Sequence, residues 1–281
     1  MPKTIVITGS SDGIGAAAAR RLVADGHQVV IVGRSPVKTR AVARELESDY
    51  LIADFTRLAD VRALAADLTA RYPRIDVLAN NAGGLFGDTT STTDGFEKTF
   101  QVNHLAPFLL TNLLLPTLLA SAATVIQTSS DAARITGKIE LDDLNNARGL
   151  SAMRTYGNAK LANILFTTEL HKRFALRGLT SAAFHPGTVA SNFGSDTSSR
   201  LARLLYGTPL FRRMLATPER AAGQLVWLAS EPAGTQWQSG RYYEKGAVAH
   251  KVHLQAQDQV LARRLWDASE AMVGLAQESA V

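Results

Sequence analysis

Two side chains with complementary acid–base chemistry stand four residues apart in the segment Y-G-N-A-K, which runs from Tyr156 to Lys160. If this segment is helical, the Tyr156 phenol and the Lys160 amine lie on one face, about a turn apart. A phenol has a pKa near ~10, and a neighbouring ammonium lowers that pKa because it stabilises the phenolate. Tyr156 is therefore a candidate general acid or base. The same spacing also occurs on ordinary helix surfaces, so the elements around the pair must decide between the two interpretations.

A glycine-rich loop follows the first predicted strand. The β-branched run 4–8 predicts a strand, the alanine-rich run 16–24 predicts a helix, and G-S-S-D-G-I-G joins them. At such a junction Gly9 permits the turn, Gly13 lets backbone N–H groups approach a pyrophosphate, and Gly15 lets the helix pack closely on the strand. The alternative is a glycine turn that binds nothing. The predicted nucleotide contacts in this loop are Gly9, Ser11, Asp12, Gly13 and Ile14.

Two basic residues follow the second predicted strand, residues 28–33. Rossmann-type chains read the adenosine ribose at this point, where an acid favours a free 2′-hydroxyl and an arginine accommodates a 2′-phosphate. Arg34, with Lys38 one helical turn later, therefore favours NADP. Two solvated bases at a helix start are the alternative.

The third predicted strand, residues 50–55, ends in an acid. The Asp54 carboxylate is a candidate acceptor for the adenine amino group, with the Phe55 backbone beside it. A helix N-cap is the competing interpretation of Asp54, although Thr56 offers that cap as well.

Small and amide residues follow the fourth predicted strand, residues 75–79. Such residues suit a backbone that passes close to a cofactor, so Asn81, Ala82 and Gly83 are predicted contacts, with Asn81 also tying neighbouring strands together. Ser130 stands at the end of the fifth predicted strand, residues 123–128, at the edge of an α/β sheet where ligands bind. His185 ends the sixth predicted strand, residues 180–184, and is predicted to be a packed residue because no cluster of His or acids accompanies it.

The order of the elements predicts the fold class. Strands alternate with helices, which predicts an α/β Rossmann-type doubly wound parallel sheet in a single domain over residues 1–281. Further predicted elements are a helix over 95–118 that Pro107 and Pro116 kink or divide, a long loop over 135–153, the Tyr156 helix to about residue 177, a helix over 218–230, a last strand over 240–243 and a terminal helix over 258–274 within the C-terminal segment 256–281. Residues 192–217 are amphipathic and basic, which favours a small helical substrate lid over a membrane-docking surface.

Composition limits the classes of function. The chain has 281 residues, of which 46% are hydrophobic and 20% charged, and it has no cysteine. Thiolate catalysis and cysteine metal sites are excluded, and no metal site is predicted. The formal net charge of +5 is spread among interleaved acids, so no nucleic-acid partner is predicted. No signal peptide or long apolar span is evident, so we expect a soluble, cytoplasmic protein with no integral membrane segment.

The joint order of these motifs resembles the short-chain dehydrogenase/reductase family nearly end to end. The matching residues are T-G-x-x-x-G-I-G from Thr8, N-N-A-G from Asn80, Asn103, Ser130, Tyr156-x-x-x-Lys160 and Pro186-Gly187. Within the family, the retinol-dehydrogenase-like branch is the most similar, on G-R-S from Gly33 with Lys38, YGNAKLANILF from Tyr156, H-P-G from His185 and AQDQVLARRLWDASEAMVGL from Ala256.

The resemblance implies a role for each matched position. Tyr156 is implied as the proton donor or acceptor, and Lys160 as the residue that lowers its pKa and holds the nicotinamide ribose. Ser130 is implied to hydrogen-bond the substrate oxygen, and Asn103 to support a water-mediated proton relay. Asn103 was not a candidate on the residues alone, because a buried mid-helix Asn is usually a satisfied polar group. The remaining implied cofactor contacts are Pro186, Gly187, Val189 and Ser191, with Thr188 a near alternative for the nicotinamide carboxamide.

These observations predict an NADP(H)-dependent oxidoreductase that interconverts a hydrophobic carbonyl compound and its alcohol. Two departures from the family bear on this. Many retinol-active relatives begin with a membrane anchor, which we do not expect in this chain, and Asp12 stands where some NADP-dependent members have a base. The alternatives are an NAD(H)-dependent alcohol dehydrogenase, a sugar-nucleotide epimerase or dehydratase, and a non-enzymatic NADP(H)-binding sensor. The resemblance also implies self-association as a homo-oligomer, with the number of subunits open.

Overall fold

The computed structural model describes residues 1–87, 91–187 and 217–275. The described elements, in chain order, are β1 (Thr4–Thr8), α1 (Gly13–Ala24), β2 (Gln28–Gly33), α2 (Pro36–Glu45), β3 (Tyr50–Ile52), α3 (Leu58–Arg71), β4 (Val77–Asn80), α4 (Lys98–Phe100), η1 (Gln101–Leu105), α5 (Ala106–Leu113), α6 (Leu115–Ala120), β5 (Thr124–Thr128), α7 (Ala132–Ile135), α8 (Ala152–Phe174), η2 (Ala175–Arg177), β6 (Thr180–His185), α11 (Pro218–Ser230), β7 (Arg241–Glu244), β8 (Ala247–Val248), η4 (Leu254–Gln257) and α12 (Gln259–Met272).

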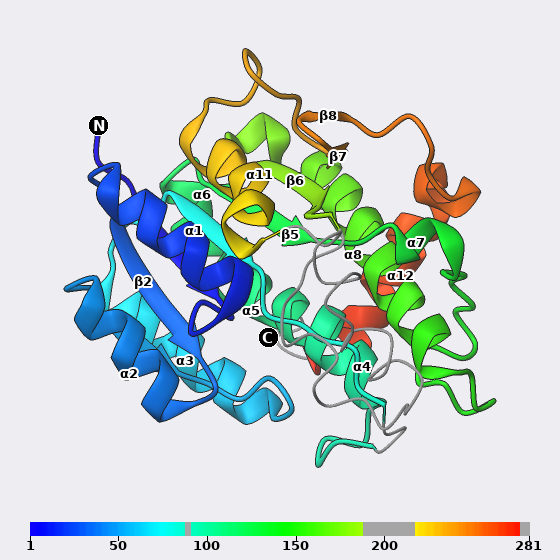
Figure 1. Cartoon of the computed structure of the whole chain (residues 1–281). Helices are drawn as coiled ribbons and strands as arrows, with labels where there is room; N and C mark the ends of the chain where they lie inside the picture. The colour runs from blue at the N-terminus through cyan, green and yellow to red at the C-terminus, as the bar shows by residue number, and fades with distance from the viewer. Residues whose placement is uncertain (88–90, 188–216, 276–281) are drawn as a thin grey trace.

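The strands form one twisted sheet in the order β3-β2-β1-β4-β5-β6-β7-β8 (Figure 1). Neighbouring strands run parallel, except for the short antiparallel pair β7–β8. The order reverses direction between β1 and β4, and in doubly wound sheets ligands bind at the carboxyl ends of the strands beside that point. The predicted fold class is confirmed.

Both faces of the sheet are buried, which explains the nearly continuous apolar runs in its central strands. Alternate residues point to opposite faces, so Ile5 and Ile7 pack with α1, α2 and α11, whereas Val6 packs with α3, α5, α8 and α12. Helices α1 and α11 lie side by side across one face (Figure 1). Helix α8 contacts β5, β6 and β7 on the other face, which carries Tyr156 and Lys160 to the sheet edge.

Three predicted boundaries in the first half of the chain need correction. The helix predicted from Gly95 begins at Lys98, because Gly95 has a φ of +84° in a turn and the Glu97 side chain caps the helix by accepting from the Phe100 N–H. The strand predicted over 50–55 ends at Ile52, since Asp54 turns the chain. The fourth strand is Val77–Asn80 rather than 75–79.

The C-terminal region also differs in detail. The helix begins at Gln259, where the Asp258 side chain accepts hydrogen bonds from the N–H groups of Val260 and Leu261. The strand β8 was not predicted, because two residues carry no periodicity. The lid predicted over 192–217 lies outside the described residues apart from Thr217, whose hydroxyl caps α11.

Proline divides the long helix as predicted. Pro107 stands at the start of α5 and Pro116 at the start of α6, where a missing N–H is tolerated. The preceding turn, η1, is a π-helix that contains Asn103. Single π turns inside helices often mark functional sites.

Candidate active site

A cleft of about 550 Å³ opens at the carboxyl ends of β1, β2, β4 and β5. The predicted residues that line it are Gly9, Ser11, Asp12, Gly13, Ile14, Arg34, Lys38, Asp54, Phe55, Asn81, Ala82, Gly83, Ser130, Tyr156, Lys160, Pro186 and Gly187. Val189 and Ser191 lie outside the described residues. Asn103 is buried behind the cleft wall.

The glycine loop is a cradle that side chains would fill. Gly9 has a φ of +67°, and a Cβ there would lie 2.8 Å from the Ala82 Cα. A Cβ on Gly15 would lie 2.7 Å from Asn81 Nδ2 and collide with the Gly9 carbonyl. Gly13 has a φ of +52° at the N-terminus of α1, where the N–H groups of the first turn and the helix dipole favour a phosphate. The loop therefore fits the pyrophosphate of a dinucleotide.

Asn81 joins three strand ends. Its Nδ2 donates to the carbonyl oxygen of Thr8 at 3.0 Å, its N–H donates to Thr8 Oγ1 at 3.0 Å, and its Oδ1 accepts from Thr128 Oγ1 at 3.3 Å. These contacts match the predicted role of tying β1, β4 and β5 together beside the cleft.

Arg34, Lys38 and the Asp12 carboxylate lie at the end of the cleft beside β2. Arg34 is exposed directly after β2, and Lys38 lies on the first turn of α2. Lys38 Nζ forms an ion pair with Asp12 Oδ2 at 2.8 Å, with both side chains more than half exposed. The Asp12 Oδ1 accepts from the Gly13 N–H at 2.8 Å, so this carboxylate touches both the glycine loop and the predicted phosphate-binding lysine.

Neither residue proposed as the cap of α3 serves that role. Asp54 Oδ1 accepts from the N–H and the hydroxyl of Thr56 at 3.0 and 2.9 Å, which closes a tight turn. The N-cap position of α3 is Arg57, and the Leu58 N–H is satisfied by Asp94 from a distant loop. Asp54 thus faces the cleft as a turn residue.

Tyr156 and Lys160 lie together on α8, as the spacing predicts. Tyr156 is 6% exposed and Lys160 is 2% exposed. Lys160 Nζ lies 5.4 Å from the centre of the Tyr156 ring and donates to the Thr128 carbonyl oxygen at 2.9 Å. Burial lowers the pKa of Lys160 to about 7, because the ammonium loses its hydration. A group with that pKa is poised to gain or lose a proton near neutrality.

Close backbone packing fixes Ser130 relative to Tyr156. A Cβ on Gly157 would overlap Thr136 Oγ1 and lie 2.8 Å from the Ala132 carbonyl oxygen, so α7 and α8 approach more closely than any other residue would allow. Ser130 precedes α7 and its hydroxyl accepts from the Ala132 N–H at 3.2 Å. Gly157 was not a predicted site residue, although its place directly after Tyr156 was a usable signal.

Asn103 acts on the cleft wall from behind. Its Nδ2 donates to the carbonyl oxygens of Gly84 and Thr99 at 2.9 and 2.8 Å, and its Oδ1 accepts from the Gly84 N–H at 3.1 Å. A Cβ on Gly83 would collide with Asn103 Oδ1 and lie 3.2 Å from Lys160 Nζ. The side chain therefore holds the Gly83–Gly84 backbone against Lys160; the relay role implied by resemblance stays a prediction.

His185 lies at the end of β6 and borders the cleft. Its Nδ1 accepts from the Asp131 N–H at 3.3 Å, and burial lowers the pKa of the ring, because the charged form loses its hydration. Within residues 1–87, 91–187 and 217–275, no three His, Asp or Glu side chains are grouped as metal ligands. In the same part of the chain, no helix has the length and apolar character needed to cross a membrane.

The sequence did not reveal the apolar lining at the catalytic end. Leu85, Phe86, Ala132 and Met153 border the cleft there, and Met153 is 46% exposed. These residues come from loops and helix starts without periodicity, so no pattern identified them.

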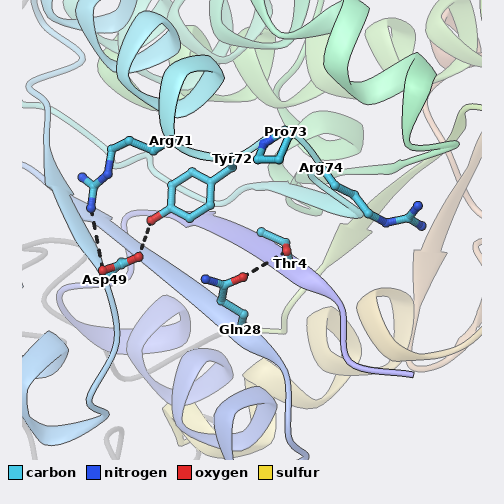
Figure 2. Close-up of a pocket in the computed structure, with 7 residues that line it drawn as sticks. All are labelled: Thr4, Gln28, Asp49, Arg71, Tyr72, Pro73 and Arg74. Carbon is cyan, nitrogen blue, oxygen red and sulfur yellow. Dashed lines mark hydrogen bonds and ion pairs between the residues drawn. The ribbon is translucent and has the colours of Figure 1, made fainter.

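A second hollow of about 310 Å³ lies at the amino ends of the strands, away from these residues (Figure 2). Its polar groups satisfy one another: the Tyr72 hydroxyl donates to Asp49 at 2.6 Å, and Arg71 lies 3.7 Å from the same carboxylate. Thr4 Oγ1 also donates to Gln28 at 3.2 Å. Arg74, drawn without a contact in Figure 2, pairs with Asp76 at 2.6 Å outside the drawn residues, so the contacts are structural.

The strand order and the glycine loop define a Rossmann-type α/β protein with a cleft at the carboxyl ends of its strands. The family model described as short chain dehydrogenase matches residues 3–202. The chain is 42% identical to "Putative daunorubicin C-13 ketoreductase DnrU" of Streptomyces sp. (strain C5), over 97% of this chain and 93% of the relative. It is 36% identical to Retinol dehydrogenase 13 of Homo sapiens, over 97% and 85% of the two chains.

A crystal structure of a protein from Mycobacterium Paratuberculosis superposes with a TM-score of 0.76 at 32% identity, over 97% of this chain and 93% of that chain. The chain belongs to the short-chain dehydrogenase/reductase family, in its retinol-dehydrogenase-like branch. It is accordingly an oxidoreductase that acts on CH–OH or carbonyl groups. The resemblance found in the sequence is confirmed.

Proposed function

We propose that this oxidoreductase uses NADP(H) to interconvert a hydrophobic carbonyl compound and its alcohol, with Tyr156 as the acid or base. The observation that carries the proposal is one continuous cleft with Arg34 and Lys38 at one end and Tyr156, Lys160 and Ser130 at the other. The names of two relatives, a ketoreductase and a retinol dehydrogenase, support carbonyl–alcohol chemistry. The apolar lining beside Tyr156 supports a hydrophobic substrate.

The residues divide the binding of the nucleotide among them. Arg34 and Lys38 would hold the 2′-phosphate, the loop from Gly9 to Ile14 would hold the pyrophosphate, and Lys160 would hold the ribose next to the nicotinamide. When bound, the dihydronicotinamide supplies a hydride, and the cofactor rather than the protein performs this part of the chemistry.

Tyr156 and Ser130 handle the substrate oxygen. In the reducing direction the phenolic hydroxyl of Tyr156 would give its proton to the carbonyl oxygen of the substrate, while the balancing hydride would be supplied by the bound cofactor. The hydroxyls of Tyr156 and Ser130 donate to the oxygen as its negative charge develops. Ser130 now donates to Asp131 Oδ1 at 3.2 Å, so its hydroxyl must turn toward the substrate.

Lys160 stabilises the phenolate form of Tyr156. A protonated Lys160 favours the phenolate by charge, and its near-neutral pKa lets it return a proton to the phenolate after transfer. Because the amine is buried, its charge acts in a medium of low dielectric and is weakly screened.

Cofactor preference is tested by titrating the protein with NADPH and NADH while following nicotinamide fluorescence. We expect tighter binding of NADPH, and the Arg34→Ala variant should weaken NADPH far more than NADH. Equal weakening of both would refute the phosphate contact and favour an NAD(H)-dependent alcohol dehydrogenase.

The chemical role is tested with Tyr156→Phe on a carbonyl compound that the unchanged protein reduces. Turnover should fall at least ~100-fold, as expected for loss of a general acid, while the dissociation constant for NADPH stays within a factor of about two. Retained turnover would refute the role of Tyr156. A protein that binds NADPH and reduces no carbonyl compound in a broad panel would instead favour the sensor.

A further inference from the structure

Lys160 depends on a carbonyl that a second side chain also contacts. The Thr128 carbonyl oxygen accepts from Lys160 Nζ at 2.9 Å and from Asn163 Nδ2 at 3.4 Å. Asn163 lies three residues after Lys160 on α8, on the same face of the helix. It is 2% exposed, so its amide must find partners inside the protein.

The Asn163 amide also reaches the π turn η1. Its Nδ2 donates to the backbone carbonyl oxygen of Asn103 at 3.0 Å. A primary amide has two N–H donors, and here they serve the carbonyls of Asn103 and Thr128. One side chain thus fixes both the carbonyl that holds the Lys160 amine and the backbone of Asn103.

A buried histidine fixes the orientation of this amide. His104 Nδ1 lies 3.2 Å from Asn163 Oδ1, and His104 Nε2 lies 3.0 Å from Ser269 Oγ on α12. Burial lowers the pKa of His104 to about 4, so the ring is neutral in ordinary buffers and only one nitrogen bears a proton. The amide oxygen accepts only, so the proton is on Nδ1 and Ser269 donates to Nε2.

Packing holds the outer end of this chain of hydrogen bonds in place. Trp266, one turn before Ser269 on α12, packs edge-on against Phe108 with ring centres 5.1 Å apart, and its ring centre lies 5.4 Å from that of Phe166. His104 lies beside Phe108 and Phe166 in the same cluster. The terminal helix is thereby coupled to the catalytic helix.

We propose that Asn163 is a positioning residue for Lys160 and Asn103, and that Ser269 on α12 holds it through His104. The proposal rests on the proposed function, because it assigns Asn163 to the support of that same acid–base site. Loss of the amide donors would let the Thr128 carbonyl and the Asn103 turn move, and with them the Lys160 amine. A displacement of about 1 Å at such a site can cost ~100-fold in rate.

The most informative variant is Asn163→Asp, which keeps the shape and the acceptor for His104 but removes both donors. Its carboxylate would also stand near the Lys160 amine and raise the pKa of that amine. Ser269→Ala weakens the same chain from its outer end. Asn112→Asp is the matched control for the first variant, since the Asn112 amide likewise donates to a helix carbonyl, that of Phe108. Ser181→Ala, a buried hydroxyl that donates to Thr167 on α8, is the control for the second.

Three measurements separate positioning from simple stability. For Asn163→Asp we expect kcat to fall at least tenfold, with KM and the NADPH dissociation constant within about twofold. The pKa read from the kcat–pH profile should rise by about one unit or more. Ser269→Ala should lower kcat less, whereas Asn112→Asp and Ser181→Ala leave kcat and the profile unchanged.

A measurement that needs no turnover separates failure of the positioning role of Asn163 from failure of the proposed function. The ¹³Cε resonance of Lys160, assigned with Lys160→Met, reports the Lys160 titration without any turnover, and it should move to higher pH in Asn163→Asp. An Asn163→Asp protein that melts at a lower temperature but retains the unchanged kcat, pH profile and Lys160 titration overturns the proposal. Absence of NADPH binding by the unchanged protein refutes the proposed function, while the Lys160 titration in Ser269→Ala, which adds no charge near the amine, still decides whether the hydrogen bonds through Asn163 position it.

Discussion

Burial of Lys160 predicts that the free energy of unfolding depends on pH. Lys160 is 2% exposed, and its pKa falls from 10.5 to about 7 on folding. Above pH 7 the unfolded chain therefore holds a proton that the native chain has released. Because the unfolded state binds more protons, the free energy of unfolding rises with pH, and this gain ends near pH 10.5, where the unfolded lysine also deprotonates.

Burying a lysine whose pKa falls on folding lowers the free energy of unfolding, and the Lys160→Met variant removes this penalty. At pH 8 the penalty amounts to ~3 kcal/mol, and at pH 10 to ~1 kcal/mol. Loss of the hydrogen bond to the Thr128 carbonyl lowers the free energy of unfolding of the variant by about 1 kcal/mol. We expect Lys160→Met to be more stable than the unchanged protein by about 2 kcal/mol at pH 8, and the difference to vanish by about pH 10. The same variant should lose turnover, because stability and activity place opposite demands on this site.

Urea unfolding at 25 °C, followed by tryptophan fluorescence at several pH values from 6 to 10, measures this difference. The control is Lys172→Met, which removes an exposed amine from the same helix. A stability difference for Lys160→Met that is constant across this pH range, or a variant less stable than the unchanged protein at pH 7, would refute the argument that burial of Lys160 sets its pKa.

Three further predictions concern packing, charge and capping. Gly157→Ala should lower the free energy of unfolding by ~2 kcal/mol and lower kcat, because its Cβ would overlap Thr136. The control is Gly223→Ala on α11, which has nothing within 4 Å of its Cβ and should raise the free energy of unfolding by up to ~1 kcal/mol in the same urea assay. Equal stability of the two variants would contradict the close approach of α7 and α8. Asp12→Asn should strengthen NADPH binding a few-fold relative to NADH in fluorescence titrations. The change removes an exposed ion pair with Lys38 that is worth at most ~1 kcal/mol, and the Asn side chain still accepts the hydrogen bond that caps α1. Unchanged or weaker NADPH binding would count against Lys38 as a phosphate contact. Asp258→Ala should lower the free energy of unfolding by ~1 kcal/mol, because two N–H groups of α12 lose their acceptor, and an unchanged urea midpoint would show that water replaces the cap.

Local chemistry explains which parts of the fold could be predicted. The apolar runs that became β1 and β2 are buried on both faces, so the strand assignment needed no knowledge of the partners. Helix α11 begins at Pro218, with Thr217 as its cap, where the sequence placed it. Short elements such as β8 and α4 were missed or misplaced, because two or three residues carry no periodic signal.

The sequence by itself determined the types and order of the candidate catalytic groups. A tyrosine and a lysine four residues apart, a serine at a strand end and glycines at the first turn are local requirements, set by side-chain chemistry and backbone conformation. Their joint order was enough to identify the family.

Only the tertiary structure decided how those groups behave. The pKa of Lys160 depends on the water removed by helices and strands distant in sequence. The partners of Asn163 come from β5, η1 and, through His104, from Ser269 on α12, more than a hundred residues away. Such contacts arise from the packing of whole elements, and no spacing along the chain specifies them.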